Sequence, residues 1–578
     1  MKNFKFLFGA FCALGMMASC SSSDDAVEGG GTTPDNSGNL YLSVNVMSSN
    51  TGTRATETGE PGTGSEEDPK NSSYEKGTET ENTVTSAVFY FFTSTGEPAN
   101  VVNQNGTMVN YYSAPVAGNS DNMPNEEKIL TAQVVINTKQ GDQIPDKMVA
   151  ILNATPTDNS SKSLSQLAAV TNDYRLAKTE KKFVMSSSVY SKDGEKKMEV
   201  EDVKPYFKSS ETVAQNNPVD VYVERVLAKV SVASAMTYDE ATGDITVNGE
   251  KLYYTDQTSD KSGNADKRLY VKFVGWDVAT ETAKSYLFKN INAAWSDADL
   301  GIVNWTWPNY YRSFWAMNPA LTDADYENHT FGNATKKVGS LDAKGDMIYG
   351  TTATDTNYTY IQENANPNST STPVAAAAPT KPTKIVVAAQ LVDKNGNAVT
   401  LAEWKGVRTT KDGVLMNMAN LSTIYYSADG GTTRTKITPD MICFPEKTNI
   451  AVLTDAVKNN TSYTFYLTSG TEAASVDVAA VNTALKNLGA AKIWEEGKTY
   501  YFTDIRHLAT YDNKPGYIGI VRNHSYQVAL QSVTGLGTPV YNPDEVIVPE
   551  NPDMDESYLA ARIKVLSWRV VKSTVDLK

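Results

Sequence analysis

Cysteine and histidine are both scarce in this chain. Among its 578 residues there are three of each, and Cys12, Cys20 and Cys443 are too few for the disulfide framework of a small secreted protein. Also missing are HExxH, GxxxxGKS or GxxxxGKT, GxSxG and CxxC, the motifs of zinc proteases, phosphate-binding loops, serine hydrolases and redox enzymes. We therefore predict no catalytic residues, no metal and no cofactor, and a fold stabilised by a hydrophobic core.

Basic residues are outnumbered by acidic ones. There are 52 Lys and Arg against 67 Asp and Glu, a net charge of −15, which argues against nucleic acid and against anionic membrane surfaces as partners. The 31 tyrosines, together with many Thr, Val and Asn residues, favour β-structure. At this length the chain has room for two domains or more.

The first twenty residues resemble an export signal. Lys2 and Lys5 form a basic start, and residues 6–17 form an apolar core that is too short to span a membrane. The sequence Met-Ala-Ser-Cys at residues 17–20 resembles a bacterial lipobox, although methionine stands where leucine is commoner. We therefore predict an exported lipoprotein precursor with its lipid on Cys20. The alternative is an ordinary signal peptide in which this cysteine is incidental.

Residues 40–47, LYLSVNVM, alternate between apolar and polar side chains. This period of two predicts a half-buried strand whose apolar face consists of Leu40, Leu42, Val44 and Val46.

A segment that cannot bury itself follows this strand. Residues 48–82 contain Gly, Thr, Glu, Ser and Pro with almost no aliphatic side chains. Arg54 is the only arginine before Arg175, and an arginine in an exposed segment is what a trypsin-like protease cuts first. Without further evidence, an ordinary loop residue is the favoured interpretation of Arg54.

From residue 83 onward, short apolar runs of strand length alternate with turn-rich loops. This pattern indicates antiparallel β-sandwiches rather than a parallel α/β sheet, with a first domain at about residues 40–234. Helices are predicted at residues 163–170 and in a segment that Asp477 caps and Gly489 ends. The main predicted strands lie at residues 83–92, 133–137, 148–153, 219–232, 268–278, 384–393, 499–503 and 526–533.

Two further patterns contain residue types that can take part in chemistry. Asp504 and His507, with Asn523 and His524, could form an acid/base cluster, but their position between strands favours ordinary polar residues at strand ends. The sequence Gly-Leu-Gly at residues 535–537 lacks the third glycine and the helix of a dinucleotide-binding loop, so we predict a turn. No carboxylate pair stands out for glycoside hydrolysis.

The last residues, 558–578, are unusually apolar for a chain end. Their apolar positions alternate and then change phase, which predicts two short strand segments joined by a bulge. Such a tail needs a groove. From the pattern alone a groove in its own domain is favoured, and the alternative is a groove in another molecule, where the tail adds a strand. The alternating positions are Ala561, Ile563 and Val565, followed by Leu566, Trp568 and Val570.

Seven stretches in order resemble the fimbrillins of the Bacteroidales, and more closely the Mfa-like major subunits of short fimbriae. The resemblance extends over essentially the whole chain, although none of the stretches is diagnostic alone. They are Glu81-Asn82 with residues 88–92 and Gly96; residues 222–230 (YVERVLAKV); 274–276 with 285–287; 309–316; 360–364 (YIQEN); 504–508; and 519–524 (GIVRNH) with 534–540.

The resemblance implies a structural subunit of a cell-surface fimbria, with two transthyretin-like antiparallel β-sandwich domains completed by donor-strand exchange. In such families a lipoprotein precursor reaches the outer membrane, a trypsin-like or Arg-specific protease cuts behind the first strand, and that strand leaves. The C-terminal segment of a neighbouring copy then fills the vacated groove. Tip and anchor subunits, and host or bacterial surface ligands, are further expected partners.

Carried onto this chain, the resemblance implies four regions. Residues 1–20 are the signal, 21–54 a propeptide with the displaced first strand, 55–234 the N-terminal domain, and 235–578 the C-terminal domain with its donor strand at 558–578. The cut falls between Arg54 and Ala55. In the isolated chain the tail is then expected to be unused.

The physical cost of losing the first strand supports this mechanism. When four aliphatic side chains leave a core, the loss of their burial costs about 6–12 kcal/mol of free energy. An incoming strand with the same alternation restores this burial. The competing hypothesis is a monomeric surface lipoprotein that binds or hydrolyses glycans, for which the tyrosines and eight tryptophans would supply stacking surfaces. The strand, the linker with its arginine and the apolar tail favour the fimbrial hypothesis.

Overall fold

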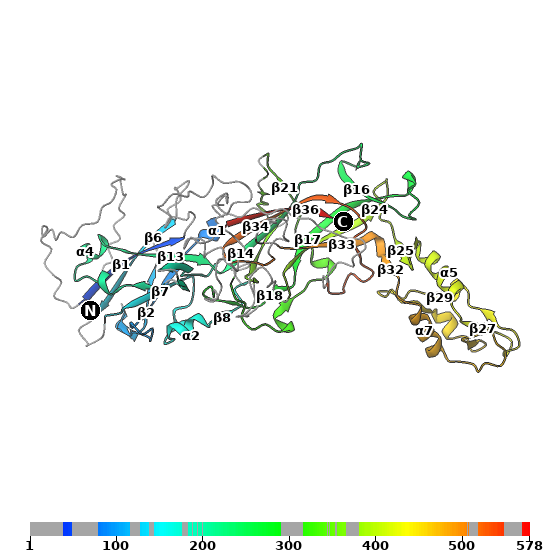
Figure 1. The fold of residues 1–578 in the computed structure, drawn as a ribbon, viewed down its shortest axis with the longest axis horizontal. Coiled ribbons are helices and arrows are strands. Elements are labelled where there is room, and N and C mark those ends of the chain that lie inside the picture. Colours follow the sequence, from blue (N-terminus) through cyan, green and yellow to red (C-terminus); the bar gives the residue numbers. More distant parts are fainter. Residues whose placement is uncertain are drawn as a thin grey trace, which may run out of the picture.

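The chain forms an elongated molecule in which β1 lies near one end and a small helical module lies at the other (Figure 1). Strands account for most of the regular structure, and the helices are few and short. The computed structural model describes residues 39–48, 79–103, 105–115, 128–137, 144–175, 183–187, 189–192, 195–198, 200–290, 316–343, 345, 347–352, 355–365, 381–505, 507, 518–547 and 569–577.

A ten-stranded sheet forms the N-terminal part of the molecule, in the order β4-β3-β6-β1-β13-β9-β7-β2-β5, with β12 beside β7. Strands β5 and β6 also contact each other, so the sheet folds over a single apolar core. The strands are β1 (Asn39–Ser48), β2 (Ser86–Phe92), β3 (Val101–Val102), β4 (Met108–Val109), β5 (Tyr111–Pro115), β6 (Lys128–Asn137), β7 (Lys147–Leu152), β9 (Met185–Ser187), β12 (Glu201–Asp202) and β13 (Val219–Arg225).

Two six-stranded sheets form the C-terminal sandwich. One has the order β22-β21-β14-β34-β36 with β23 beside β14, and the other the order β15-β16-β17-β24-β33-β35. Apolar residues of both sheets, among them Val230, Trp276, Val387 and Tyr526, fill the core between them. The strands are β14 (Leu227–Ser234), β15 (Ile245–Val247), β16 (Glu250–Thr258), β17 (Arg268–Ala279), β21 (Gly339–Leu341), β22 (Met347–Ile348), β23 (Tyr358–Gln362), β24 (Lys384–Val392), β33 (Lys498–Asp504), β34 (His524–Val533), β35 (Thr538–Pro539) and β36 (Arg569–Leu577).

A third core, which the sequence did not suggest, belongs to the helical module between β24 and β33. The module enters and leaves the sandwich through two paired strands, β25 (Leu401–Trp404) and β32 (Lys492–Trp494). The other elements of the module are β26 (Val407–Thr409), α5 (Lys411–Leu421), β27 (Tyr425–Ser427), β28 (Thr435–Lys436), β29 (Ile442–Cys443), β30 (Val452–Leu453), α6 (Asp455–Lys458), β31 (Thr464–Tyr466) and α7 (Val478–Asn487).

The shorter elements lie around these cores. Helix α1 (Glu79–Asn82) precedes β2, and α4 (Glu211–Gln215) precedes β13. The remaining described elements are α2 (Leu164–Ala168), β8 (Thr171–Asn172), β10 (Val189–Lys192), β11 (Glu195–Met198), β18 (Glu281–Thr282), β19 (Ser285–Tyr286) and β20 (Tyr326–Glu327), with short 3-10 turns between strands.

Local signals placed several of these elements correctly. The Asp477 side chain accepts a hydrogen bond from the Ala480 amide and caps α7, as predicted. Gly535 and Gly537 have positive φ angles of 76° and 64°, which confirms the turn. The predicted strand at residues 219–232 is two strands, because the chain passes from the N-terminal sheet to the C-terminal sandwich at Val226. The cores therefore change before the predicted boundary at residue 234.

The pairing is mostly antiparallel, with a few parallel contacts. Strand β1 runs parallel to β13, and β34 lies between β14 and β36, parallel to both. The predicted first strand and the C-terminal tail therefore each take part in a parallel contact, and β14 also runs parallel to β21.

Candidate functional site

The predicted first strand is an interior strand of the N-terminal sheet. All ten residues of β1 pair antiparallel with β6, from Asn39 opposite Asn137 to Ser48 opposite Lys128. On its other side the second half of β1 pairs in parallel with β13, with Val44 opposite Val219. Removing β1 would therefore open a slot with unpaired backbone groups on both walls.

The apolar face of β1 points into the core. Leu42, Val44 and Val46 are no more than 1% exposed, and Leu40 is half-buried against the same core. This confirms the apolar face that the alternation predicted. On the opposite face Ser43 is also buried, so β1 is covered on both faces at this point.

The start of β1 has a second backbone partner. The Tyr41 amide donates to the Lys208 carbonyl and the Lys208 amide donates to the Tyr41 carbonyl, both at 2.8 Å. Helix α4, which follows Lys208, also contacts β1. Tyr41 is thereby paired on both sides, to β6 and to Lys208, although β13 pairs with β1 only from Val44 onward.

Several predicted site residues lie outside the described part of the chain. They are the lipidation residue Cys20, the cleavage pair Arg54 and Ala55, and the tail residues Ala561, Ile563, Val565, Leu566 and Trp568. Their assignments stay predictions. Of the predicted tail positions, Val570 lies in β36.

The end of the tail pairs with its own chain. Strand β36 runs parallel to β34, from Arg569 opposite His524 to Leu577 opposite Val533. For residues 569–577 the expectation of an unused tail is therefore wrong. The physical reason is that β34 would otherwise present the unpaired N–H and C=O groups of a sheet edge. Among the described strands, β36 has a partner on this one side only.

Residues from the stretches that resemble fimbrillins meet where the two sandwiches join. Glu81 of α1 and Lys229 of β14 form an ion pair with Nζ and Oε1 3.1 Å apart, and both side chains are completely buried. The Tyr360 hydroxyl donates to the same Glu81 oxygen, and the Lys229 ammonium lies 3.7 Å from the centre of the Tyr349 ring. Burial, and next the negative charge of Glu81, raise the pKa of Tyr360.

Arg225, at the end of β13, extends this cluster. Its Nε donates to the Glu81 carbonyl at 2.9 Å, and its Nη1 donates to Oδ1 of Asn523 at 3.0 Å. The backbone N–H of Asn523 in turn donates to the Leu227 carbonyl at 2.8 Å. Asn523 has a φ of 54°, a left-handed conformation that asparagine tolerates better than most residues.

A second buried ion pair lies at the same junction. Arg522 Nη2 and Glu363 Oε2 are 2.8 Å apart, and neither side chain is more than 4% exposed. Arg522 Nη1 also donates to the Leu287 carbonyl at 2.9 Å, which accepts from the Ser186 hydroxyl of the N-terminal sheet at 2.7 Å. Leu287 is packed in the N-terminal core. The segment around Leu287, which follows β19, is thus anchored in the core of the N-terminal sheet and is held there by Arg522.

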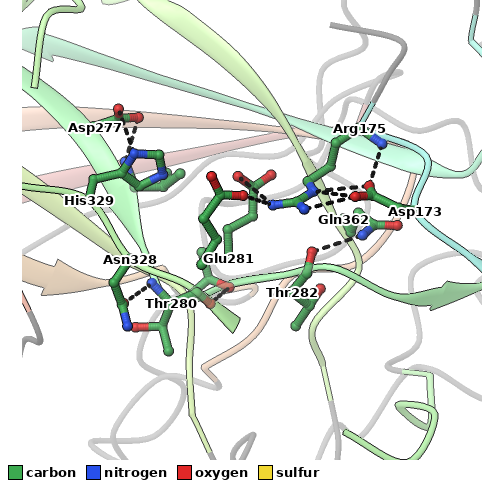
Figure 2. Close-up of polar contacts among 12 residues, drawn as sticks. Asp173, Arg175, Asp277, Thr280, Glu281, Thr282, Asn328, His329 and Gln362 are labelled. Carbon is green, nitrogen blue, oxygen red and sulfur yellow. Dashed lines mark hydrogen bonds and ion pairs between the residues drawn. The ribbon is translucent and has the colours of Figure 1, made fainter. Parts of the chain in front are cut away.

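The outer part of the junction surrounds Arg175, with Asp173, Glu281 and Gln362 (Figure 2). Arg175 hydrogen-bonds Asp173 and lies 3.7 Å from the buried Glu281 carboxylate, on the other side of the junction. The hydrogen bond with Asp173 raises the pKa of Arg175. Gln362 accepts from the Tyr174 amide and donates to the Thr282 carbonyl. Strands β8 and β19 also pair across the junction.

The two histidines weighed for catalysis do lie together, but inside the protein. The His507 and His524 ring centres are 4.9 Å apart, and both side chains are at most 2% exposed. His507 Nδ1 lies 2.9 Å from the Tyr526 hydroxyl, which accepts from the Val521 amide. A substrate has no access to buried groups, so we interpret them as core polar residues.

The described residues contain no group of three or more His, Cys, Asp or Glu side chains arranged to hold a metal ion. Within the same residues, no helix has the length and apolarity needed to cross a membrane.

Residues 492–574 match a family model described as the major fimbrial subunit protein type IV, fimbrillin, C-terminal. The matched segment runs from β32 through β33, β34 and β35 into β36. It therefore includes the strand on which the tail lies. No curated protein gives a significant match.

Solved structures give weak likenesses over most of the chain. A protein assigned to cell adhesion from Parabacteroides distasonis has a TM-score of 0.36 and 12% identity, covering 92% of this chain and 96% of its own. Porphyromonas gingivalis fimbrilin FimA has a TM-score of 0.32 and 12% identity, with coverages of 93% and 96%. The tip fimbrial protein Mfa3 of the same species, with a C-terminal truncation, has a TM-score of 0.26 and 10% identity, with coverages of 93% and 100%.

Proposed function

We propose that the chain is the shaft subunit of a cell-surface fimbria that polymerises by strand exchange. The match of residues 492–574 to the C-terminal fimbrillin model supports a structural fimbrial subunit rather than an enzyme. In the proposal, an exported lipoprotein precursor carries lipid on Cys20 and reaches the outer membrane. A trypsin-like or Arg-specific protease then cuts between Arg54 and Ala55 and releases β1.

The observation that carries this proposal is the position of β1. It is an interior strand that hydrogen-bonds to a neighbour on each side. Its covalent connection to the other strands of the sheet runs through the segment that contains Arg54. A cut there leaves β1 held by non-covalent contacts alone. The vacated slot would expose the former sites of Leu42, Val44 and Val46, which no monomer can leave open without cost.

The tail of a second copy supplies the replacement in this proposal. Residues Ala561, Ile563 and Val565, followed by Leu566, Trp568 and Val570, offer the alternation that the slot accepts. A strand between β6 and β13 pairs on two sides, whereas β36 pairs with β34 alone among the strands that the structure describes. Transfer of the tail from its own sheet to a neighbour's slot therefore adds backbone hydrogen bonds as well as apolar burial.

The proposed contact is head-to-tail. The slot belongs to the N-terminal sheet and the donor to the C-terminal sandwich, so each added copy presents a new slot or a new tail. A heterologous contact of this kind propagates as a fibre unless its rotation closes a ring. Tip and anchor subunits would end such a fibre, and host or bacterial surface ligands would be its adhesive targets.

An Arg-specific protease gives the cleanest test, because Lys70 and Lys76 lie in the same linker and would also be cut by trypsin. The unchanged chain, starting at residue 21, should acquire an N-terminus at Ala55 and then form fibres in negative-stain images. Arg54→Ala and the matched Arg54→Lys should stay uncut and monomeric under this protease. Trypsin should still cut Arg54→Lys and restore its fibres.

Fibres from uncut Arg54→Ala would refute the proposed trigger. A cleaved chain that stays monomeric while binding glycan would instead favour the monomeric lipoprotein that binds or hydrolyses glycans.

A further inference from the structure

The buried pair of Glu81 and Lys229 joins three segments that are distant in the sequence. Glu81 lies in α1, Lys229 in β14, the first strand after the domain change, and Tyr360 in β23. Together with Arg225, which binds the Glu81 carbonyl, these residues connect α1 to both sandwiches. We propose that this cluster is a joint that fixes the two sandwiches as one rigid body, and that Glu81 is its central residue.

Burial makes the joint sensitive to the loss of either partner. Both charged side chains of the Glu81–Lys229 pair are fully buried, so neither charge can turn to water if the other is removed. An unpaired buried charge is far more costly than an unpaired surface charge. The joint therefore has one favourable arrangement, and separation of the sandwiches would expose both charges at once.

The joint is not confined to one point. Arg522, which is paired with Glu363, donates to the Leu287 carbonyl, and Leu287 is packed in the N-terminal core. On the outer side, Arg175 lies between Asp173 and Glu281 (Figure 2). Contacts at separate points around one junction restrain rotation as well as separation, because a hinge about any single contact breaks the others.

The position of Glu81 in the chain has a further consequence, which rests on the proposed function. Glu81 lies after Arg54, so the proposed cut removes β1 but leaves α1 in the mature subunit. The joint is therefore retained when the slot opens. A subunit that receives a tail at one sandwich and donates a tail from the other then keeps a constant geometry between the two, which is what a straight fibre requires.

Distances between spin labels test this directly. Labels at Asn100→Cys in the N-terminal domain and Asn395→Cys in the C-terminal sandwich occupy exposed positions, in a Cys443→Ser background of the chain from residue 21. Double electron–electron resonance should give one narrow distance distribution for the intact chain. The same narrow distribution should persist after cleavage at Arg54. The first result does not depend on processing, so it separates failure of the joint from failure of the proposed function.

Two variants probe the joint itself. Lys229→Met should broaden the distribution at least twofold, and Arg175→Gln, at a less buried position, should broaden it with little loss of folding. The matched control is Lys272→Met, which breaks the exposed pair with Glu250 inside one sheet and should leave the width unchanged. A broad distribution in the intact chain, or an unchanged width in both joint variants, would overturn the proposal. A distance distribution that is narrow in the intact chain but broadens after cleavage would show that the mature subunit does not retain the joint.

Discussion

Val46 of β1 lies opposite Val221 of β13 in parallel register, and both side chains are buried in the N-terminal core. A strand proposed to be removed by processing would ordinarily be sought at a sheet edge, but β1 lies in the interior, between β6 and β13. In the proposal, a replacement strand would therefore have to satisfy two backbone ladders and one apolar face, so the slot would select an alternating strand.

The stability of the precursor should depend on β1, and that of the mature subunit should not. Leu42→Ala is expected to cost the precursor about 2–5 kcal/mol in free energy of unfolding, because the side chain is fully buried. In polymer formed after cleavage the same variant should behave like the unchanged chain, since β1 is gone. Thermal or denaturant unfolding of both forms measures the difference.

Leu152→Ala is the matched control, because Leu152 of β7 is buried in the same core and stays in the mature subunit. It should destabilise both forms. If Leu42→Ala also lowers the free energy of unfolding of the cleaved form, β1 has not left the sheet.

Point substitutions in the tail separate its two roles. In the proposal, positions 563 and 565 act only in a neighbour's slot, so the monomer of the Ile563→Asp, Val565→Asp variant should keep its melting temperature. The slot should reject the charged tail, and fibres should be absent. Lys564→Ser, between the two positions, is the control and should polymerise. The measurements are monomer melting curves and negative-stain images after cleavage. Normal fibres from the double Asp variant would remove these residues from the donor segment.

Deleting residues 561–578 makes a different comparison, because it also removes β36. The structure leads us to expect a lower melting temperature than that of the Asp variant, since β34 loses nine paired positions. A deletion that melts like the full chain would mean that β36 contributes nothing to the monomer.

Local patterns predicted the strands well because alternation and burial coincide there. The predicted strand at 40–47 is β1, Asn39–Ser48, and the run at 384–393 is β24, Lys384–Val392. The domain change at Val226 was not foreseen, because apolar residues continue through it and nothing in a one-dimensional pattern marks a change of sheet. Helix α5 was missed because Met416 and Leu421, which are apolar but exposed, blur the pattern of its buried stripe.

The junction could be suspected but not assembled from the sequence. Lys229 stands inside an apolar run, and a lysine there needs a buried partner. That its partner is Glu81, nearly 150 residues earlier, depends on how the sandwiches pack. Likewise the tail's alternation predicted a strand, but the choice of β34 as its neighbour in the single chain is a tertiary contact.

Alkaline pH should destabilise the fold through its buried tyrosines. Burial raises the pKa of Tyr90, Tyr174, Tyr360 and Tyr501. In the unfolded chain the tyrosine hydroxyls ionise at about pH 10, whereas the buried hydroxyls of the folded chain stay neutral there. The stabilising contribution of these tyrosines is therefore complete below that pH and is lost as the pH rises above it. Melting temperatures at about pH 8 and about pH 11 should show the decrease.

Tyr501→Phe should reduce the decrease in melting temperature at alkaline pH, because burial alone raises the pKa of the Tyr501 hydroxyl. Tyr206→Phe, at an exposed position, should not. Equal pH dependence in both variants would mean that other groups control alkaline unfolding.

The most direct test of the central claim is to prevent β1 from leaving after the chain has been cut. Ser43 lies opposite Gln133 of β6, so Ser43→Cys with Gln133→Cys, in a Cys443→Ser background, places two thiols across one antiparallel register pair. Negative-stain microscopy after Arg-specific cleavage is then done with the disulfide oxidised and again after reduction. We predict cleavage at Arg54 in both, no fibres when oxidised, and fibres on reduction. Fibres of equal length from the oxidised protein would contradict the account, because polymerisation would then proceed with β1 in place.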